Sequence, residues 1–121
     1  MRGTIAAALI MLAAAGAKAQ LIAVSNNITN ASFWIYVYSK DDITKWVSCA
    51  VIDLGMAPQG GIAQSYIHHA TADGCMNYAG LDLKIEMQQT GWECTLDDVL
   101  WSATVAVRYD RNSPSQFTCS K

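Results

Sequence analysis

Histidine is the side chain in this sequence best suited to acid–base catalysis, and the chain contains two, His68 and His69. Neighbouring side chains on a strand point to opposite faces, so these two are poorly placed to hold one metal ion. A metal site would need one of them plus distant carboxylates such as Asp53 or Asp73, and a hydrolase would pair one of them with a carboxylate. Ser65 lies close by, but the Gly-x-Ser-x-Gly frame of a nucleophile elbow is missing. The sequence therefore predicts no catalytic residue, and a small His/carboxylate-dependent hydrolase is kept as an alternative.

The acidic residues form no recognisable metal or glycosidase site. Asp41-Asp42 and Asp97-Asp98 are adjacent pairs in segments expected to be turns, where carboxylates are normally solvated. Glu93 lies near the second pair, but the spacing of a calcium-binding EF-hand loop is missing. The cysteines contain no Cys-x-x-Cys pair, which argues against zinc. The sequence therefore predicts neither a bound metal nor a cofactor.

We expect disulfides between the four cysteines, Cys49, Cys75, Cys94 and Cys119. Four cysteines allow three pairings. If successive strands alternate in direction, Cys94 and Cys119 lie at the same end of the domain. This favours Cys94–Cys119 and leaves Cys49 for Cys75. Each bridge would contribute roughly 3 kcal/mol to stability, and such bridges indicate a compartment outside the cytosol.

The beginning of the chain has the pattern of a removable signal peptide. Arg2 precedes an uncharged apolar run from Ile5 to Ala15, which is too short to span a bilayer. Ala17-Lys18-Ala19 then matches a small-x-small cleavage site. We therefore predict a signal peptide over residues 1–19 and a single secreted domain over residues 20–121. The expected location is extracellular or, in a bacterium, periplasmic, with no membrane span after cleavage.

Two glycosylation sequons follow closely, Asn27-Ile28-Thr29 and Asn30-Ala31-Ser32. In a eukaryotic secretory pathway either asparagine could receive a glycan, and the segment Asn26–Asn30 is expected to be an exposed turn. In a bacterium the same triplets would have no such meaning. Asn27 and Asn30 are therefore candidate glycosylation sites whose use depends on the source.

Alternation of apolar and polar residues dominates the rest of the chain, and no segment has a convincing helical period. In Leu81–Gln88 the odd-numbered residues are apolar and the even-numbered ones are charged or amide, which is typical of a half-buried strand. Val99–Tyr109 repeats the pattern. At most one helical turn is expected, near Asp97-Asp98. The expected strands are Leu21–Ser25, Ala31–Ser39, Lys45–Leu54, Ile62–Ala70, Leu81–Gln88, Val99–Tyr109 and Gln116–Ser120.

Turn signals separate these strands at fairly regular intervals. Gly55–Gly61 contains Pro58 and two glycines, and Arg111–Ser115 contains Pro114. Short strands with such punctuation indicate a sandwich or small barrel. We therefore predict a single small all-β sandwich, immunoglobulin-like or related, with about seven antiparallel strands and two disulfides.

The expected strand over residues 33–38 is unusual because both of its faces are apolar. Phe33, Ile35 and Val37 suit a core, which places the alternate residues on the opposite face. Aromatic side chains with polar tips suit the recognition of a protein or a sugar ring. The alternative is a central strand covered on both faces. The candidate binding residues are Trp34, Tyr36 and Tyr38.

The charge balance excludes some functions. The chain has 8 Lys+Arg against 10 Asp+Glu and a net charge of -2, which argues against nucleic acid and against a membrane-lytic peptide. We predict a secreted, non-enzymatic, effector-like binding module that recognises a protein or a cell-surface glycan. The alternatives are a periplasmic inhibitor or immunity protein, the hydrolase described above, and a structural surface component.

Overall fold

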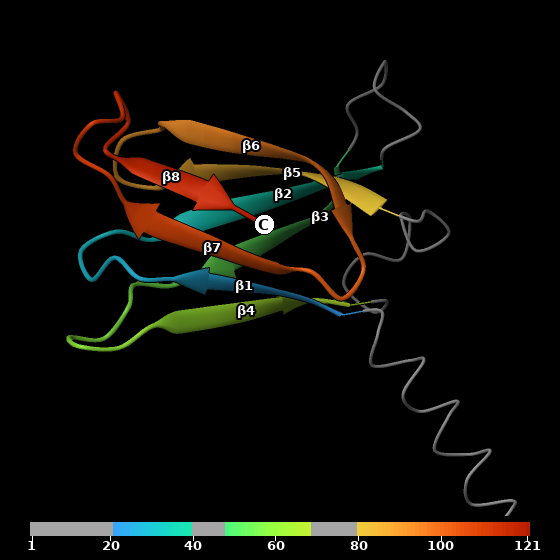
Figure 1. Ribbon diagram of the computed structural model, residues 1–121, viewed down its shortest axis with the longest axis horizontal. Coiled ribbons are helices and arrows are strands. Elements are labelled where there is room, and N and C mark those ends of the chain that lie inside the picture. The colour runs from blue at the N-terminus through green and yellow to red at the C-terminus, as the bar shows by residue number, and fades with distance from the viewer. Residues whose placement is uncertain (1–20, 40–47, 69–79) are drawn as a thin grey trace, which may run out of the picture.

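Strands and loops account for the residues that the structure describes. The computed structural model describes residues 21–39, 48–68 and 80–121, in which eight strands form two four-stranded sheets. One sheet lies in front of the other in Figure 1, which confirms the expected all-β, sandwich-like architecture. An immunoglobulin-like topology in particular stays a prediction. The signal peptide predicted over residues 1–19 lies outside the described residues.

The first sheet, called the β1 sheet below, has the strand order β4-β1-β7-β8. Its strands span Ala63–Ile67 (β4), Ile22–Asn26 (β1), Thr104–Tyr109 (β7) and Phe117–Ser120 (β8). The strands β1 and β7 pair in parallel, so the expectation of wholly antiparallel strands is wrong at this pair. Between β1 and β7 the chain contributes strands to the other sheet, so β1 and β7 are not joined by a hairpin that would make them antiparallel.

The second sheet, called the β2 sheet, has the order β3-β2-β5-β6 and is antiparallel throughout. Its strands span Ser48–Leu54 (β3), Phe33–Ser39 (β2), Gly80–Met87 (β5) and Glu93–Leu100 (β6). Strand β2 is therefore a central strand with a partner on each side.

The core lies between the two sheets. The rings of Phe33 on β2 and Phe117 on β8 pack against each other across it, with centroids 5.1 Å apart. The alternation in β5 correctly predicted which of its residues face the core: Leu81, Leu83 and Ile85 are almost completely buried. Other completely buried side chains among the described residues include Ile22, Ile35, Leu54, Ile67, Val24, Val37, Val99, Val105 and Val107. Removal of this apolar surface from water is the main force that holds the two sheets together.

The segment predicted as one strand, Val99–Tyr109, is divided between two strands in different sheets. Strand β6 ends at Leu100 and β7 begins at Thr104. Between them Ser102 has a φ of 80°, in the left-handed region, which allows a sharp turn from one sheet into the other. The residues on either side of Ser102 pack against the core. The apolar alternation therefore continues across the turn, and it concealed the break in the strand.

The expected turn or short helix near Asp97-Asp98 is wrong, because these residues form a β-bulge within β6. Asp97 and Asp98 together stand opposite the single residue Asp82 of β5. Asp98 has a φ of 56°, and its backbone N–H donates to Oδ1 of Asp82 at 3.0 Å. Both bulge residues are exposed. This extra residue interrupts the alternation, which explains why the sequence pattern did not indicate a strand here.

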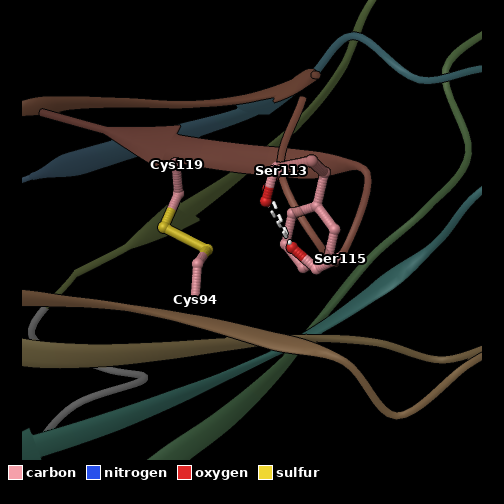
Figure 2. Close-up of a disulfide and its surroundings, with 5 residues drawn as sticks. Cys94, Ser113, Ser115 and Cys119 are labelled. Atoms are coloured by element: carbon pink, nitrogen blue, oxygen red, sulfur yellow. Dashed lines mark hydrogen bonds between the residues drawn. A yellow bond between two sulfur atoms is a disulfide. The ribbon is translucent and has the colours of Figure 1, made fainter. Parts of the chain in front are cut away.

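A disulfide joins the two sheets at one edge. Cys94 of β6 and Cys119 of β8 are bonded, with Cα atoms 6.3 Å apart, and Figure 2 shows the bridge crossing between the two strands. The predicted pair Cys94–Cys119 is therefore confirmed, although Cys94 lies within a strand and not in a loop. Cys49 is also disulfide-bonded. Its predicted partner Cys75 lies outside the described residues, so that pairing stays a prediction.

The hairpin between β5 and β6 depends on Gly91. The backbone N–H of Met87 donates to Trp92 O at 2.8 Å, and that of Gly91 donates to Met87 O at 2.9 Å. Gly91 has a φ of 78°, a conformation that other residues adopt only with strain.

Replacing Gly91 with alanine is expected to lower the free energy of unfolding by about 1 kcal/mol. An added Cβ meets nothing within 4 Å, so the loss comes from the backbone conformation alone. Urea denaturation would measure it. Gly55→Ala is the matched control, because its Cβ also meets nothing and its φ is not positive. An equal loss in both variants would contradict this explanation.

Candidate functional site

The outer face of the β2 sheet carries the three candidate binding residues. Phe33, Ile35 and Val37 on β2 are completely buried, and the side chains between them point to the opposite face. Trp34 is 37% exposed there, and Tyr36 is half-buried. Tyr38 is half-buried as well. The structure therefore brings the predicted aromatic residues together on one accessible sheet face.

Carboxylates flank Trp34 on both neighbouring strands. In the sheet register Trp34 stands between Asp53 of β3 and Glu86 of β5. The Oδ1 atom of Asp53 accepts a hydrogen bond from Nε2 of Gln88 at 2.9 Å. Oε1 of Gln88 in turn accepts from Ser32 Oγ at 3.0 Å. These bonds hold one carboxylate in a fixed position beside the exposed indole.

Lys84 lies among these acidic and aromatic groups, next to Tyr36 on the neighbouring strand. Its Nζ atom stands 4.6 Å from the centroid of the Tyr36 ring, within the range of a cation–π interaction. The same atom lies 3.9 Å from Oε2 of Glu93 on β6. The positive charge of Lys84 is therefore already paired within the face.

A shallow groove of about 350 Å³ runs beside Tyr38, over β5 and toward β6. Acidic residues from two strands line it, Asp82 from β5 and Glu93 and Asp97 from β6. The remaining lining residues are Tyr38, Leu83, Lys84 and Thr95. Carboxylates thus surround a concave surface that has an aromatic ring on one side.

We call this surface the aromatic–acidic face. It is made of Trp34, Tyr36, Tyr38, Asp53, Asp82, Lys84, Glu86, Glu93 and Asp97. Among these described residues Lys84 alone is basic. The carboxylates of the face therefore outnumber its lysine, although Lys121 at its margin donates to the main-chain carbonyls of Asp97 and Asp98. This excess of negative charge comes from strands that are distant in sequence but adjacent in the sheet.

The alternative catalytic site is only partly within the described residues. His68 is exposed directly after β4, while His69 and Asp73 lie outside the description. Ser65 Oγ donates to the main-chain carbonyl of Asp53 at 3.0 Å, and this bond ties the edge strands β4 and β3 together. Among the described residues no group of three or more His, Cys, Asp or Glu side chains could hold a metal ion.

Both candidate glycosylation sites lie in the exposed loop between β1 and β2. Asn27 and Thr29 are exposed, so the first sequon is open. Asn30 is exposed too, but Ser32 of the second sequon is buried. The Ser32 hydroxyl donates to Gln88 and accepts from Nε2 of Gln89 at 2.9 Å. Glycosylation at either asparagine stays a prediction.

The structure shows a second concave site, which the sequence pattern did not predict. A pocket of about 240 Å³ lies where three loops meet, beside Tyr109 at the end of β7. Tyr109 continues the apolar alternation of Val99–Tyr109, so it was expected in the core, yet it is 63% exposed. The position of Tyr109 directly before the expected turn Arg111–Ser115 was the one feature of the sequence that indicated its exposure. The other lining residues are Ile28, Asn30, Ala31, Met87, Gln89, Thr90 and Gln116.

Comparison with known proteins gives no further assignment. No protein-family model matches the chain, and no curated protein matches it in sequence. Within the described residues no helix has the length and apolar character needed to cross a membrane. The fold and the site define a disulfide-bonded, all-β protein that exposes an aromatic–acidic sheet face.

Proposed function

We propose that the protein is a secreted, non-enzymatic interaction protein whose aromatic–acidic face binds a positively charged surface of a partner protein. The observation that carries the proposal is Trp34, a partly exposed indole near the start of the central strand β2 with a carboxylate on each side. The Cys94–Cys119 disulfide is consistent with an extracellular or periplasmic location.

Aromatic residues on a rigid sheet make efficient binding anchors. Tryptophan and tyrosine bury a large area at a low cost in conformational entropy, and they are common among the residues that dominate binding energy. Strand β2 is paired on both sides along Trp34 and Tyr36. The rings therefore need little reorganisation before a partner binds.

The contacts of Lys84 indicate the chemistry of that partner. Its ammonium group rests over the ring of Tyr36 and beside the carboxylate of Glu93. An arginine or lysine of a partner would find the same combination at Trp34, between Asp53 and Glu86. The negative potential of the face would also speed association with a basic surface and make it sensitive to salt.

A periplasmic inhibitor or immunity protein would be one form of this function, with an enzyme as the basic partner. The hydrolase alternative stays a prediction, because His69 and Asp73 lie outside the described residues. A glycan partner is better matched by a different part of the molecule, described in the next subsection.

Replacing Trp34 with alanine is expected to weaken partner binding at least 30-fold, equivalent to about 2 kcal/mol, because a central anchor is lost. The stability loss should stay below the roughly 3–5 kcal/mol of a fully buried tryptophan, since the ring is partly exposed. Partners captured from the extracellular fluid of the source would first be identified by mass spectrometry. The dissociation constant of each purified partner would then be measured at low and high salt.

Tyr66→Ala is the matched control. Tyr66 is 46% exposed on β4 of the other sheet, so its loss should leave binding unchanged. A large fall in melting temperature for Trp34→Ala would place the indole in a structural role. Equal weakening by both substitutions, or binding that strengthens with salt, would place the interface elsewhere.

A further inference from the structure

The pocket beside Tyr109 is formed by three loops at one end of the sandwich. These are the β1–β2 loop (27–32), the β5–β6 hairpin (88–92) and the β7–β8 turn (110–116), which gather at the left of Figure 1. The first two are joined directly, because the backbone N–H of Gln88 donates to Ser32 O at 2.8 Å. The pocket therefore brings together segments that are far apart in the sequence.

The chemistry of this pocket differs from that of the aromatic–acidic face. Every lining residue is uncharged, so neither an anion, a cation nor a metal ion would find a counter-charge there. Ile28 and Met87 supply apolar surface. Asn30, Thr90 and Gln116 supply amide and hydroxyl groups. The volume of about 240 Å³ is below the range for drug-sized ligands, roughly 300–1,000 Å³, and suits a single ring.

We propose that this pocket binds the pyranose ring of a neutral carbohydrate. A sugar ring has a face of C–H groups, which an aromatic ring such as Tyr109 attracts through its negative π surface. It also has an edge of hydroxyl groups that each donate and accept. Side-chain amides match such an edge because each amide offers two donors and an acceptor. The proposal uses none of the residues of the aromatic–acidic face.

The pocket is already organised for binding. The side chain of Gln89 is fixed by Ser32, whose backbone N–H donates to Oε1 at 3.1 Å. Thr90 Oγ1 accepts from Trp92 N–H at 3.2 Å, which leaves the hydroxyl hydrogen of Thr90 to donate outward. Within the described part of the chain, the side-chain amides of Asn30 and Gln116 make no hydrogen bond, so both are available to a ligand.

Gln116 is held in a conformation that glutamine rarely adopts. Its φ is 65°, in the left-handed region that favours glycine. Its backbone N–H donates to Ser113 O at 2.9 Å, and its carbonyl accepts from Asp110 N–H at 3.0 Å. The turn is further fixed by the hydrogen bond between the hydroxyls of Ser113 and Ser115, visible in Figure 2. The backbone thereby fixes the direction in which the Gln116 side chain leaves the turn.

Two sources offer the same pyranose chemistry. One is a carbohydrate on another molecule. The other is the first sugar of a glycan attached to Asn30, since this asparagine lines the pocket and belongs to a sequon. The experiment therefore needs one arm with protein that has no glycan and one arm with protein from a glycosylating host.

In the first arm, unglycosylated protein would be titrated with the methyl glycosides of glucose, mannose, galactose and N-acetylglucosamine. Amide resonances would be followed by NMR. We expect one of these probes to shift the side-chain amides of Asn30 and Gln116 with saturation. Tyr109→Ala should weaken that binding at least tenfold, and Tyr66→Ala should not change it.

Gln116→Gly provides a second variant that keeps the fold. Glycine adopts the left-handed conformation without strain, so stability should be retained or rise while sugar binding weakens several-fold. Unchanged binding in this variant and in Tyr109→Ala would overturn the assignment of the site.

In the second arm, glycoprotein would be compared with its enzymatically deglycosylated form. A sugar attached to Asn30 that occupies the pocket should make Tyr109→Ala more destabilising in the glycosylated form. Saturable binding in the first arm alone identifies an external carbohydrate. The absence both of probe shifts and of this glycan-dependent difference would overturn the proposal, and the Trp34 experiment would be unaffected.

Discussion

Replacing Asn26 with alanine is expected to lower the free energy of unfolding by about 4 kcal/mol, with a fall in Tm of roughly 20 °C. Asn26 is completely buried at the end of β1. Its Nδ2 donates to Ala31 O at 2.8 Å and to Gly55 O at 2.9 Å. Its Oδ1 accepts from Ile28 N–H at 2.9 Å. Alanine would leave these three main-chain groups without their partner, and each such loss costs roughly 1–3 kcal/mol.

The position of Asn26 explains why the effect should be global. One side chain fixes the β1–β2 loop through Ile28 and Ala31, and the same side chain holds the β3–β4 connection through Gly55. Both connections pass from one sheet to the other. Loss of Asn26 should therefore weaken the attachment of the two sheets and not only one loop.

Urea denaturation of two further variants tests this explanation. Asn26→Asp keeps the shape of the side chain but presents an oxygen to carbonyls that need a donor, so it should destabilise at least as much as alanine. Asn27→Ala changes the exposed neighbouring asparagine and should alter stability by less than about 0.5 kcal/mol. A loss below about 1 kcal/mol in Asn26→Ala would show that water replaces the amide.

The sequence pattern was sufficient to predict the sheets but not this residue. Alternation located the buried face of β5 and the two faces of β2, because side chains along a strand point to alternate faces and one face packs against the core. Asn26 was assigned to an exposed polar turn, since asparagine is common in turns. Its three partners are main-chain groups of folded loops, and no local pattern records them.

The same limit applies to the candidate site. The sequence pattern separated Trp34 from the core, but the carboxylates beside it come from β3 and β5, whose pairing with β2 is long-range. The bulge at Asp97-Asp98 was interpreted as a solvated turn, although it places Asp97 in the groove of the aromatic–acidic face. Local sequence therefore predicted the aromatic half of the face, and only the sheet register revealed the acidic half.

Removing the Cys94–Cys119 disulfide is expected to lower the free energy of unfolding by about 3.5 kcal/mol, the chain-entropy value for a loop closed over 25 residues. The bridge joins β6 and β8, the edge strands of the two sheets on this side of the sandwich. Among the described strands β8 pairs only with β7, and it supplies Phe117 to the core. Without the bridge, β8 is held by that pairing, by packing, and by Lys121 directly after it, whose Nζ donates to the main-chain carbonyls of Asp97 and Asp98 on β6.

A double-mutant cycle with Cys94→Ser, Cys119→Ser and the double variant separates the bridge from the local effect of each substitution. Either single change already breaks the bond, so the double variant should be hardly less stable than the singles. Losses that add would show that the bridge itself stabilises little. Hydrogen exchange should localise the change, because the amides of β8 lose protection first if the bridge anchors this edge. Ser120→Ala, an exposed change on the same strand, should leave that protection intact.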